Sequence, residues 1–422
     1  MPAIHAGTPR AGALLVVTAL APFALGYFLS YLFRAVNAVV GPNLVADIGL
    51  SAAELGLLTS AYLLAFAAFQ LPLGVLLDRF GPRRVQAALL AAAATGSLLF
   101  SLADGIVGLT LARGLIGLGF AGGLMAGFKA VVLWVPEPRR PLANACVMSF
   151  GALGILVATV PTELAVQAFG WRSVFVGLAL VTLAVAALIL IVVPEKAIPH
   201  APGGLQAQVA SIVRIFSDGA FWRLAPLLAT TAGAHIGIQT LWAGPWFRDV
   251  AGYDRIGVAS WLMVLAGSFW IGILLSGWVA DRLIRRGVDI LTVMLGFLAV
   301  FLVVEVLIVM QWTALNAVMW PLFGMTGQVA VLAYPWLASY FGAALSGRAH
   351  TAVNLLLFAT AFGVQYLIGA IIDMFSTPGA ETYDPLGYQV AFGLVLGLQI
   401  LSLAWFLAGW RRLRLPEAAA AD

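Results

Sequence analysis

Charged residues are scarce in this chain of 422 residues. Asp, Glu, Lys and Arg together make up 9% of the sequence, whereas about a quarter of a typical soluble domain is charged. Hydrophobic residues make up 62%, so a water-soluble globule of this size would lack polar surface. This composition excludes a cytoplasmic enzyme and a disordered protein. A nucleic-acid-binding protein is excluded as well, because the basic residues form short, scattered clusters.

Cysteine is almost absent too, since Cys146 is the only one in the sequence. A single thiol excludes an intramolecular disulfide and a thiolate metal cluster. The sequence also has no phosphate-binding loop, cofactor motif or Ser/His/Asp cluster. We therefore expect no catalytic activity, no cofactor and no bound metal.

Long apolar runs fill most of the chain, separated by short polar or Gly/Pro segments. A helix needs about 20 predominantly apolar residues to cross the hydrocarbon core of a bilayer. The sequence therefore predicts an all-α membrane protein with twelve transmembrane helices. The predicted spans are 13–40, 54–77, 83–103, 106–134, 141–167, 172–193, 221–244, 257–280, 289–310, 314–341, 349–374 and 388–411.

The positions of Lys and Arg predict the orientation, because cytoplasmic loops of membrane proteins carry an excess of these residues. With both termini in the cytoplasm, sixteen of the 22 lie in cytoplasmic segments, three in outer loops and three within spans. We therefore expect a multi-pass protein of the inner (plasma) membrane with both termini cytoplasmic.

The chain consists of two similar halves. Residues 74–84 read GVLLDRFGPRR and follow the second span, whereas residues 277–286 read GWVADRLIRR and follow the eighth. A segment rich in Pro and Gly, 194–220, predicts a cytoplasmic linker between two six-helix bundles, 1–193 and 221–422. Parallel six-span repeats of this kind are a transporter architecture.

Two motifs resemble those of the major facilitator superfamily. Residues 74–84 resemble its signature loop, and LTLARGLIGLG at 109–119 resembles its fourth-span motif with a buried arginine. The resemblance implies two bundles related by a pseudo-twofold axis, and a central cavity that opens alternately to each side. The fifth span, GALGILVATVPTE at 151–163, lacks the Gly-Pro dipeptide of exporters that work by exchange, which favours symport or uniport.

The repeated loops are candidate gates. The resemblance implies that Asp78 faces the start of the eleventh span, where a helix N-terminus and nearby guanidinium groups stabilise a carboxylate. Asp281 would face the start of the fifth span in the same way, and both contacts would favour the outward-facing state. The alternative is that these loops only set the topology. The basic residues of the two candidate gates are Arg79, Arg83, Arg84, Arg282 and Arg285.

Arg34 lies within the first span. An intramembrane charge indicates a functional site, because its insertion costs at least about 2.5–3.5 kcal/mol. Tyr27, Tyr31 and Arg34 share one helix face, and Asn37 lies on or near that face. Such a stripe suits the carboxylate or phosphate of a partly aromatic solute.

Arg113 matches the fourth-span arginine that is linked to proton coupling in the family. A buried guanidinium can lower the pKa of a nearby carboxylate, and Glu163 is the candidate partner. A packing role for Arg113 is the alternative. Structural ion pairs of Arg34 with Glu163 or Asp47 are also open.

Lys129, Glu305 and Asp373 are three other charged residues within the predicted spans. Lys129 either extends to the membrane interface or faces the cavity opposite Tyr334, where a Tyr-Pro-Trp sequence breaks the tenth span. We expect Glu305 and Asp373 to be peripheral, since the ninth span usually packs outside the cavity in this family.

The second half offers mostly neutral polar groups. His235, Gln239 and Trp242 follow each other at i, i+4 and i+7 in the seventh span. His235 is either a proton site, because imidazole titrates near neutral pH, or a packing residue. The remaining candidate ligands, which can alternatively join helices, are Gln328, Tyr334, Asn354 and Gln365.

The charges expected near the cavity predict the solute. Arg34, Arg113, Lys129 and Glu163 together give a cavity charge of about +2, which attracts an anion. We therefore predict a monomeric, proton-coupled symporter of a small organic anion. Efflux of amphipathic compounds, suggested by 13 Trp and 25 Phe, and import of a metal chelate are the alternatives.

Overall fold

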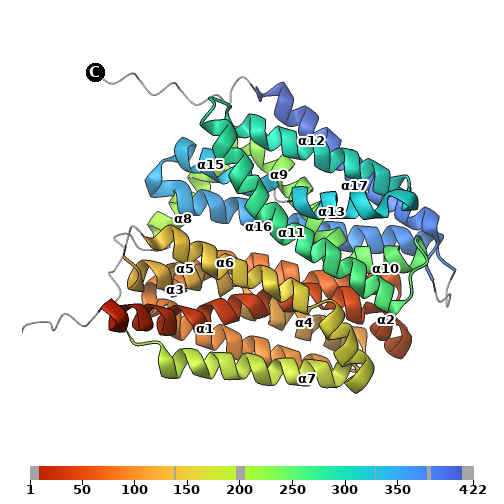
Figure 1. Ribbon diagram of the computed structural model, residues 1–422, viewed down its shortest axis with the longest axis horizontal. Coiled ribbons are helices and arrows are strands. Elements are labelled where there is room, and N and C mark those ends of the chain that lie inside the picture. The colour runs from red at the N-terminus through yellow and green to blue at the C-terminus, as the bar shows by residue number, and fades with distance from the viewer. Residues whose placement is uncertain (1–8, 137–138, 196–204, 328, 378–381, 411–422) are drawn as a thin grey trace, which may run out of the picture.

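The computed structural model describes residues 9–136, 139–195, 205–327, 329–377 and 382–410, and every regular element in these ranges is a helix. Figure 1 shows two layers, with α1–α7 along one side and α9–α17 along the other. The first layer and the α8 connection comprise α1 (Pro9–Ala35), α2 (Asn37–Ile48), α3 (Ala52–Leu102), α4 (Ile106–Phe120), α5 (Gly123–Trp134), α6 (Arg140–Val157), α7 (Val160–Val192) and α8 (Leu205–Phe216). The second comprises α9 (Gly219–Gly237), the π-helix η2 (Ile238–Trp242), α10 (Ala243–Asp249), α11 (Arg255–Ile284), α12 (Ile290–Val309), the 3₁₀ turn η3 (Thr313–Leu315), α13 (Asn316–Thr326), α14 (Val329–Leu332), α15 (Tyr334–Phe341), α16 (Ala343–Phe375) and α17 (Pro385–Ala408).

The predicted all-α membrane fold is confirmed. Within the described ranges, nine helices are long and apolar enough to cross a bilayer, or ten if α1 and α2, bent by 45°, form one span. The fifth and seventh predicted spans, which correspond to α6 and to α9, η2 and α10, are not among these helices. The count of twelve spans and the cytoplasmic termini stay predictions.

The predicted linker 194–220 lies partly outside the described residues, which resume at Leu205. Its described part forms α8, which packs against α16, where Arg348 donates a hydrogen bond to Ser211. The division into bundles 1–193 and 221–422 stays a prediction.

Two long helices each contain a break at a glycine. Gly81 in α3 and Gly170 in α7 have φ angles of 78° and 75°, a conformation that glycine adopts without steric cost. Both breaks fall where the sequence predicts short loops between successive spans. At each break the chain changes direction, and helical structure continues directly on both sides of the glycine.

The two layers approach closely between α2 and α10 and between α3 and α16. A Cβ atom added at Gly244 of α10 would lie 2.6 Å from the carbonyl oxygen of Ala38, and one at Gly56 of α3 would lie 2.8 Å from that of Gln365. Any larger residue at either glycine would push the layers apart. We call this side of the molecule the closed end, at the right of Figure 1.

Polar contacts join the layers at the closed end. Asp373, at the end of α16, accepts hydrogen bonds of 2.8 Å from the backbone N–H groups of both Ala52 and Ala53, at the start of α3. The carboxylate thereby satisfies two N–H groups that the helix leaves unpaired and stabilises its positive end. Asp373 was expected to be peripheral, and that expectation was wrong.

Arg255, at the start of α11, makes the second contact between the layers. Its Nε lies 3.0 Å from a carboxylate oxygen of Glu163, and its Nη2 donates a 2.6 Å hydrogen bond to Asn43. The Glu163 side chain is almost fully buried, so this ion pair is shielded from water on one side.

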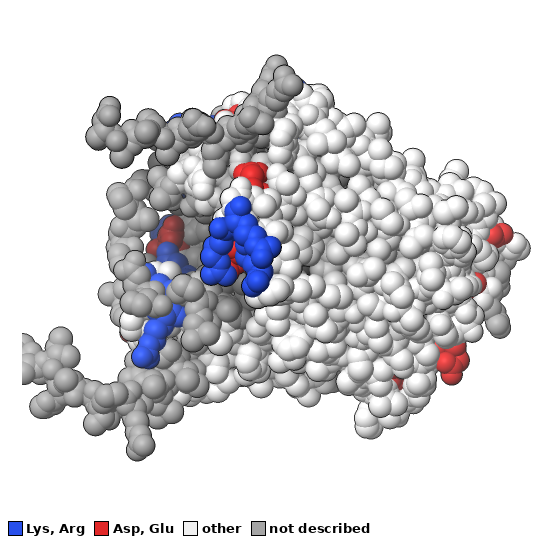
Figure 2. Space-filling view, turned by 45° about the horizontal axis from the view of Figure 1, so that its top comes forward, with Lys and Arg blue, Asp and Glu red and all other residues white. Residues whose placement is uncertain are grey.

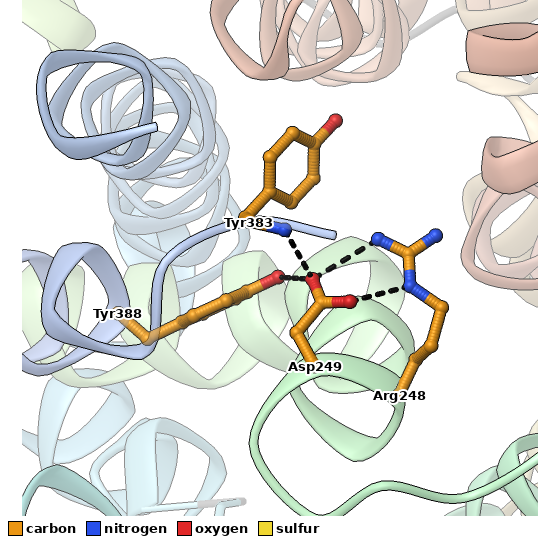
Figure 3. A network of polar contacts seen from close by, with 4 residues as sticks. All are labelled: Arg248, Asp249, Tyr383 and Tyr388. Atoms are coloured by element: carbon orange, nitrogen blue, oxygen red, sulfur yellow. Dashed lines mark hydrogen bonds and ion pairs between the residues drawn. The ribbon is translucent and has the colours of Figure 1, made fainter. Parts of the chain in front are cut away.

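A buried carboxylate anchors the adjoining part of the second layer (Figure 3). Asp249 accepts hydrogen bonds from Arg248 Nε at 2.5 Å and from the Tyr388 hydroxyl at 2.6 Å. Its side chain is fully buried, and the backbone N–H of Tyr383 lies 3.4 Å from it. Burial also raises the pKa of Tyr383 to about 12, so this phenol stays neutral at physiological pH. The network fixes α10 to the start of α17.

Figure 2 shows the basic side chains gathered toward the opposite end of the molecule, which we call the arginine-rich end. At this end, each ion pair between described residues joins two residues of the same layer. Examples are Asp281 with Arg285 and Arg83 with Glu195. An apolar cluster at this end also contains only residues from Ile215 to Phe406, whereas the largest cluster includes residues of both layers. The layers are thus joined mainly at the closed end.

We expect Asp373→Ala to open the closed end, because two helix N–H groups lose a charged acceptor. Each hydrogen bond to a charged group contributes about 1.5–3 kcal/mol, and 1.4 kcal/mol corresponds to a tenfold change. Maleimide labelling of Val258→Cys, in a Cys146→Ser background, should accelerate at least roughly tenfold. Asp384→Ala, which removes a cap inside the second layer, is the matched control and should leave labelling unchanged. Equal labelling rates in all three proteins would contradict the assignment of Asp373 as a contact that closes this end.

Candidate functional site

A cavity of about 250 Å³ lies between the two layers. Its wall is formed by α1, α3, α5 and α6 from the first layer, and by α9, η2, α11 and α14–α16 from the second. The cavity reaches toward the arginine-rich end, since Ser276 and Gly277 of α11 line it and Asp281 follows one turn later. The volume is slightly below the usual range of about 300–1,000 Å³ for ligand pockets, which indicates a small solute.

Among the described residues of the cavity wall, Arg34 is the one that carries a fixed charge. It lies in the last turn of α1, just before the bend into α2, and its exposed fraction is 8%. Its guanidinium carbon is 4.6 Å from the ring centre of Tyr31, 5.0 Å from that of Phe358 and 5.2 Å from that of Phe66. The Nε atom is buried and has no hydrogen-bond partner, so one donor of this fixed cation is left unsatisfied.

Two tyrosine-centred pairs face the cavity from opposite layers. The Tyr27 hydroxyl donates to that of Tyr31 at 3.3 Å, and the rings meet edge to face. The Tyr334 hydroxyl donates to Asn354 at 2.6 Å. The structure thus brings together the predicted first-span stripe and the predicted break in the tenth span.

The last turn of α9 and the π-helix η2 that follows it place two further polar groups on the wall. His235 is packed between Phe269 and Phe323, with ring centres 5.4 and 5.2 Å away, and its Nε2 has no partner. Gln239 lies one turn later, and its Nε2 is also buried without a partner. A π-turn often marks a functional site, because it interrupts the regular ladder and re-aims side chains.

Three predicted ligands lie behind the wall rather than on it. Asn37 is fully buried and donates a 3.1 Å hydrogen bond to Thr59. Trp242 donates to the backbone oxygen of Gln365 at 3.0 Å, and the Gln365 amide donates to Thr240 at 2.8 Å. These side chains join neighbouring helices. Gln328, another predicted ligand, lies outside the described residues.

Lys129 is bound to Asp78 in an ion pair between α5 and α3. The lysine therefore extends toward the arginine-rich end and is not part of the cavity wall. The expected contact of Asp78 with the start of the eleventh span is replaced by this pair, and the expected contact of Asp281 with the fifth span is replaced by its pair with Arg285. The cause is the separation of the layers at this end, which leaves each aspartate only partners from its own layer.

The basic residues of the two loops are also held within single layers. Arg83 and Arg84 both bind Glu195, which the sequence analysis missed, while Arg79 and Arg282 lie beside the rings of Phe80 and Trp278. No gating contact between the layers involves these side chains among the described residues.

Arg113 and Glu163 do not form the expected pair. Arg113 is fully buried in α4, donates a 2.7 Å hydrogen bond to the Phe33 carbonyl and lies 5.0 Å from the Tyr62 ring. Glu163 binds Arg255 at the closed end instead. Asp47, the other structural candidate for Arg34, accepts a hydrogen bond from Trp171. Arg34 is thus left free of both acids.

Several wall residues escaped the sequence analysis, among them Phe66, Gln70 and Phe358. An aromatic ring in an apolar span carries no signal that separates a cavity wall from a lipid-facing surface. Phe66 and Phe358 meet across the two layers with ring centres 4.5 Å apart, which only the tertiary structure shows.

A polytopic bundle with a cavity between two helical layers is the architecture of a secondary transporter. Residues 23–370 match the sequence pattern of the major facilitator superfamily. The chain therefore belongs to the major facilitator superfamily, whose members are transporters and not enzymes.

The named relatives have low sequence identity to this chain or align with only part of it. The chain is 24% identical over 280 residues to a probable sulfoacetate transporter of Cupriavidus necator, with 62% of this chain and 64% of that protein covered. It is 32% identical over 176 residues to a probable galactarate/D-glucarate transporter of Bacillus subtilis, covering 40% and 39%. The chain thus spans less than two thirds of the length of these relatives.

Solved structures share the fold over almost the whole chain. A bacterial homologue of the human lysosomal transporter Spinster, in an inward-facing and occupied conformation, gives a TM-score of 0.78 at 16% identity, covering 98% of this chain and all of that one. A point mutant of the nucleoside transporter NupG gives 0.73 at 12% identity, covering 92% and 99%. At these identities the likeness concerns the fold alone.

We expect Asn37→Ala to lower stability without changing the cavity, because Asn37 binds Thr59 behind the wall. Leaving a buried partner unsatisfied costs about 1–3 kcal/mol, so the melting temperature in detergent should fall by a few degrees. Ligand affinity should stay within about twofold. A tenfold loss of affinity with an unchanged melting temperature would return Asn37 to the binding site.

Proposed function

We propose that the protein carries a small organic anion across the inner membrane by alternating access, in symport with a proton. The observation that carries this proposal is the buried guanidinium of Arg34 on the cavity wall, with Nε unpaired. A fixed cation in a cavity with largely apolar walls attracts an anion and provides the strong hydrogen bonds that a carboxylate or sulfonate accepts.

The charge of the described wall supports an anionic solute. Arg34 supplies one positive charge, and no Asp or Glu is among the described wall residues. An organic amine would meet a like charge and no carboxylate. The sequence predicts a cavity charge of about +2. The charge of the described wall is also positive but smaller, because Lys129 and Arg113 are bound elsewhere.

The names of the relatives point the same way. Sulfoacetate, galactarate and D-glucarate, the solutes named for two of them, are organic anions. The short aligned lengths leave the solute of this chain open within that class.

The asymmetry between the two ends supports alternating access. Asp373 and Arg255 join the layers at the closed end, while the cavity reaches toward the arginine-rich end. If the arginine-rich end is cytoplasmic, as its basic residues predict, this arrangement is an inward-facing state. The Asp78–Lys129 pair would then belong to this state, and Asp78 would change partners as the arginine-rich end closes. That the protein acts as a monomer stays a prediction.

Proton coupling requires a titratable group that senses the solute. Glu163 was one candidate, but it lies in the closed end, bound to Arg255. His235 lies on the cavity wall with Nε2 unpartnered, and its imidazole is a side chain that can take up or release a proton. We therefore assign the proposed coupling to His235.

We expect Arg34→Ala to reduce uptake of a transported organic anion into proteoliposomes by at least roughly a hundredfold, since the buried charge pair is worth about 3 kcal/mol or more. Arg34→Lys should retain part of the activity, because the charge remains. Arg214→Ala, which changes an exposed arginine of α8, is the control and should transport normally. Normal transport by Arg34→Ala would remove Arg34 from the site.

We expect His235→Gln to bind the solute but to lose the dependence of uptake on an imposed pH gradient. Glutamine keeps a hydrogen-bonding nitrogen at a similar reach and cannot titrate. The measurement is initial uptake with and without the gradient, in variant and wild type. An unchanged gradient response in the variant would assign coupling to another group, and no response in the wild type would contradict proton symport.

A further inference from the structure

With His235 neutral, the described cavity wall balances one negative charge. Arg34 is the charged residue on the described wall. Lys129 is neutralised by Asp78, and the Arg113 guanidinium is directed at the Phe33 carbonyl behind the wall. A second acidic group on the solute would therefore enter an apolar space without a counter-charge, which is costly.

The space around the guanidinium is aromatic. The rings of Tyr31, Phe66 and Phe358 surround Arg34 at 4.6–5.2 Å. Phe269 and Leu357 continue the apolar wall in the second layer. An anion bound to Arg34 would thus have its body against rings and aliphatic groups, where apolar surface is favourable.

Several polar side chains of the wall are already hydrogen-bonded, either to one another or to the backbone. Tyr27 binds Tyr31, and Tyr334 binds Asn354. The Gln70 amide is shared between two backbone oxygens, those of Phe66 at 3.4 Å and Ala121 at 3.2 Å.

Besides Arg34, the unpartnered buried nitrogens on the described wall are those of His235 and Gln239. Each hydroxyl of a sugar acid must exchange water for a partner in the site. A hexarate has four hydroxyls, so a polyhydroxylated body would compete for wall groups that are already paired with each other, those of Tyr27, Tyr31, Tyr334 and Asn354.

We propose that the solute is a small monoanion with an aromatic or branched apolar body, either a monocarboxylate or a monosulfonate. The proposal rests on the proposed function and narrows it, because it excludes dianions and polyhydroxy acids. It assigns specificity to the single charge of Arg34 and to the ring enclosure formed by Tyr31, Phe66 and Phe358.

Two matched pairs of probes test the charge and the polarity separately. Benzoate and isophthalate differ by one carboxylate, whereas isobutyrate and lactate differ by a methyl in place of a hydroxyl. Binding is measured by calorimetry on the purified full-length protein at pH 8. Benzoate should bind at least tenfold more tightly than isophthalate, and isobutyrate should bind more tightly than lactate. Equal or tighter binding of isophthalate, or of lactate, would overturn the proposal.

Two variants show which group sets the charge limit. His235→Gln should keep the preference for benzoate, because the limit comes from Arg34. If the variant prefers benzoate but the wild type prefers isophthalate, His235 supplies a second charge and the proposal is wrong. Gln239→Lys adds a cation to the wall and should improve isophthalate binding at least tenfold, with little change for benzoate. No improvement in a Gln239→Lys protein that keeps the wild-type melting temperature would contradict the single-charge account.

The outcome also separates this proposal from the broader one. Tight isophthalate binding that Arg34→Ala abolishes would overturn the monoanion limit and leave organic-anion transport standing. Binding of organic cations alone, with no response to any of the four acids, would overturn both.

Discussion

A buried guanidinium with an unpaired donor, held between two helical layers, is the constraint on which the cavity depends. An unpaired intramembrane charge costs at least about 2.5–3.5 kcal/mol on insertion scales. The structure offsets part of that cost with aromatic faces, since Tyr31, Phe66 and Phe358 surround Arg34. A bound anion would offset the remainder. The free protein carries the cost of an unpaired buried charge, and anion binding would remove that cost. Its removal would contribute to the binding free energy.

The same constraint explains how the two ends of the molecule relate to the cavity. Phe66 comes from α3 and Phe358 from α16, so the enclosure of Arg34 is complete only while these helices pack together. Their packing is fixed at the closed end, where Asp373 of α16 caps the start of α3. Movement of one layer against the other would therefore change the environment of Arg34 as it opens this end. Solute binding and the position of the layers are linked through one pair of helices.

Local helix geometry made part of the site predictable. Tyr27, Tyr31 and Arg34 share a face in any α-helix, so their common face followed from spacing, while its orientation toward the cavity was implied by the family resemblance. Asn37 was misplaced because the chain bends by 45° between α1 and α2, and the sequence does not mark that bend. Partners across the fold were not predictable: Glu163 binds Arg255, and Lys129 binds Asp78, because of how the layers are placed in this state. The fold class, in contrast, depends on composition and motif and was predictable.

An experimental structure of the protein with 4-bromobenzoate tests the central role of Arg34 most directly. The bromine marks the orientation of the ring through its anomalous scattering or its strong density. We predict that the carboxylate lies within about 3.2 Å of the Arg34 guanidinium nitrogens, with the ring between Phe66 and Phe358. A carboxylate bound to other groups of the cavity, with Arg34 Nε still unpaired, would contradict the assignment of Arg34 as the anion site.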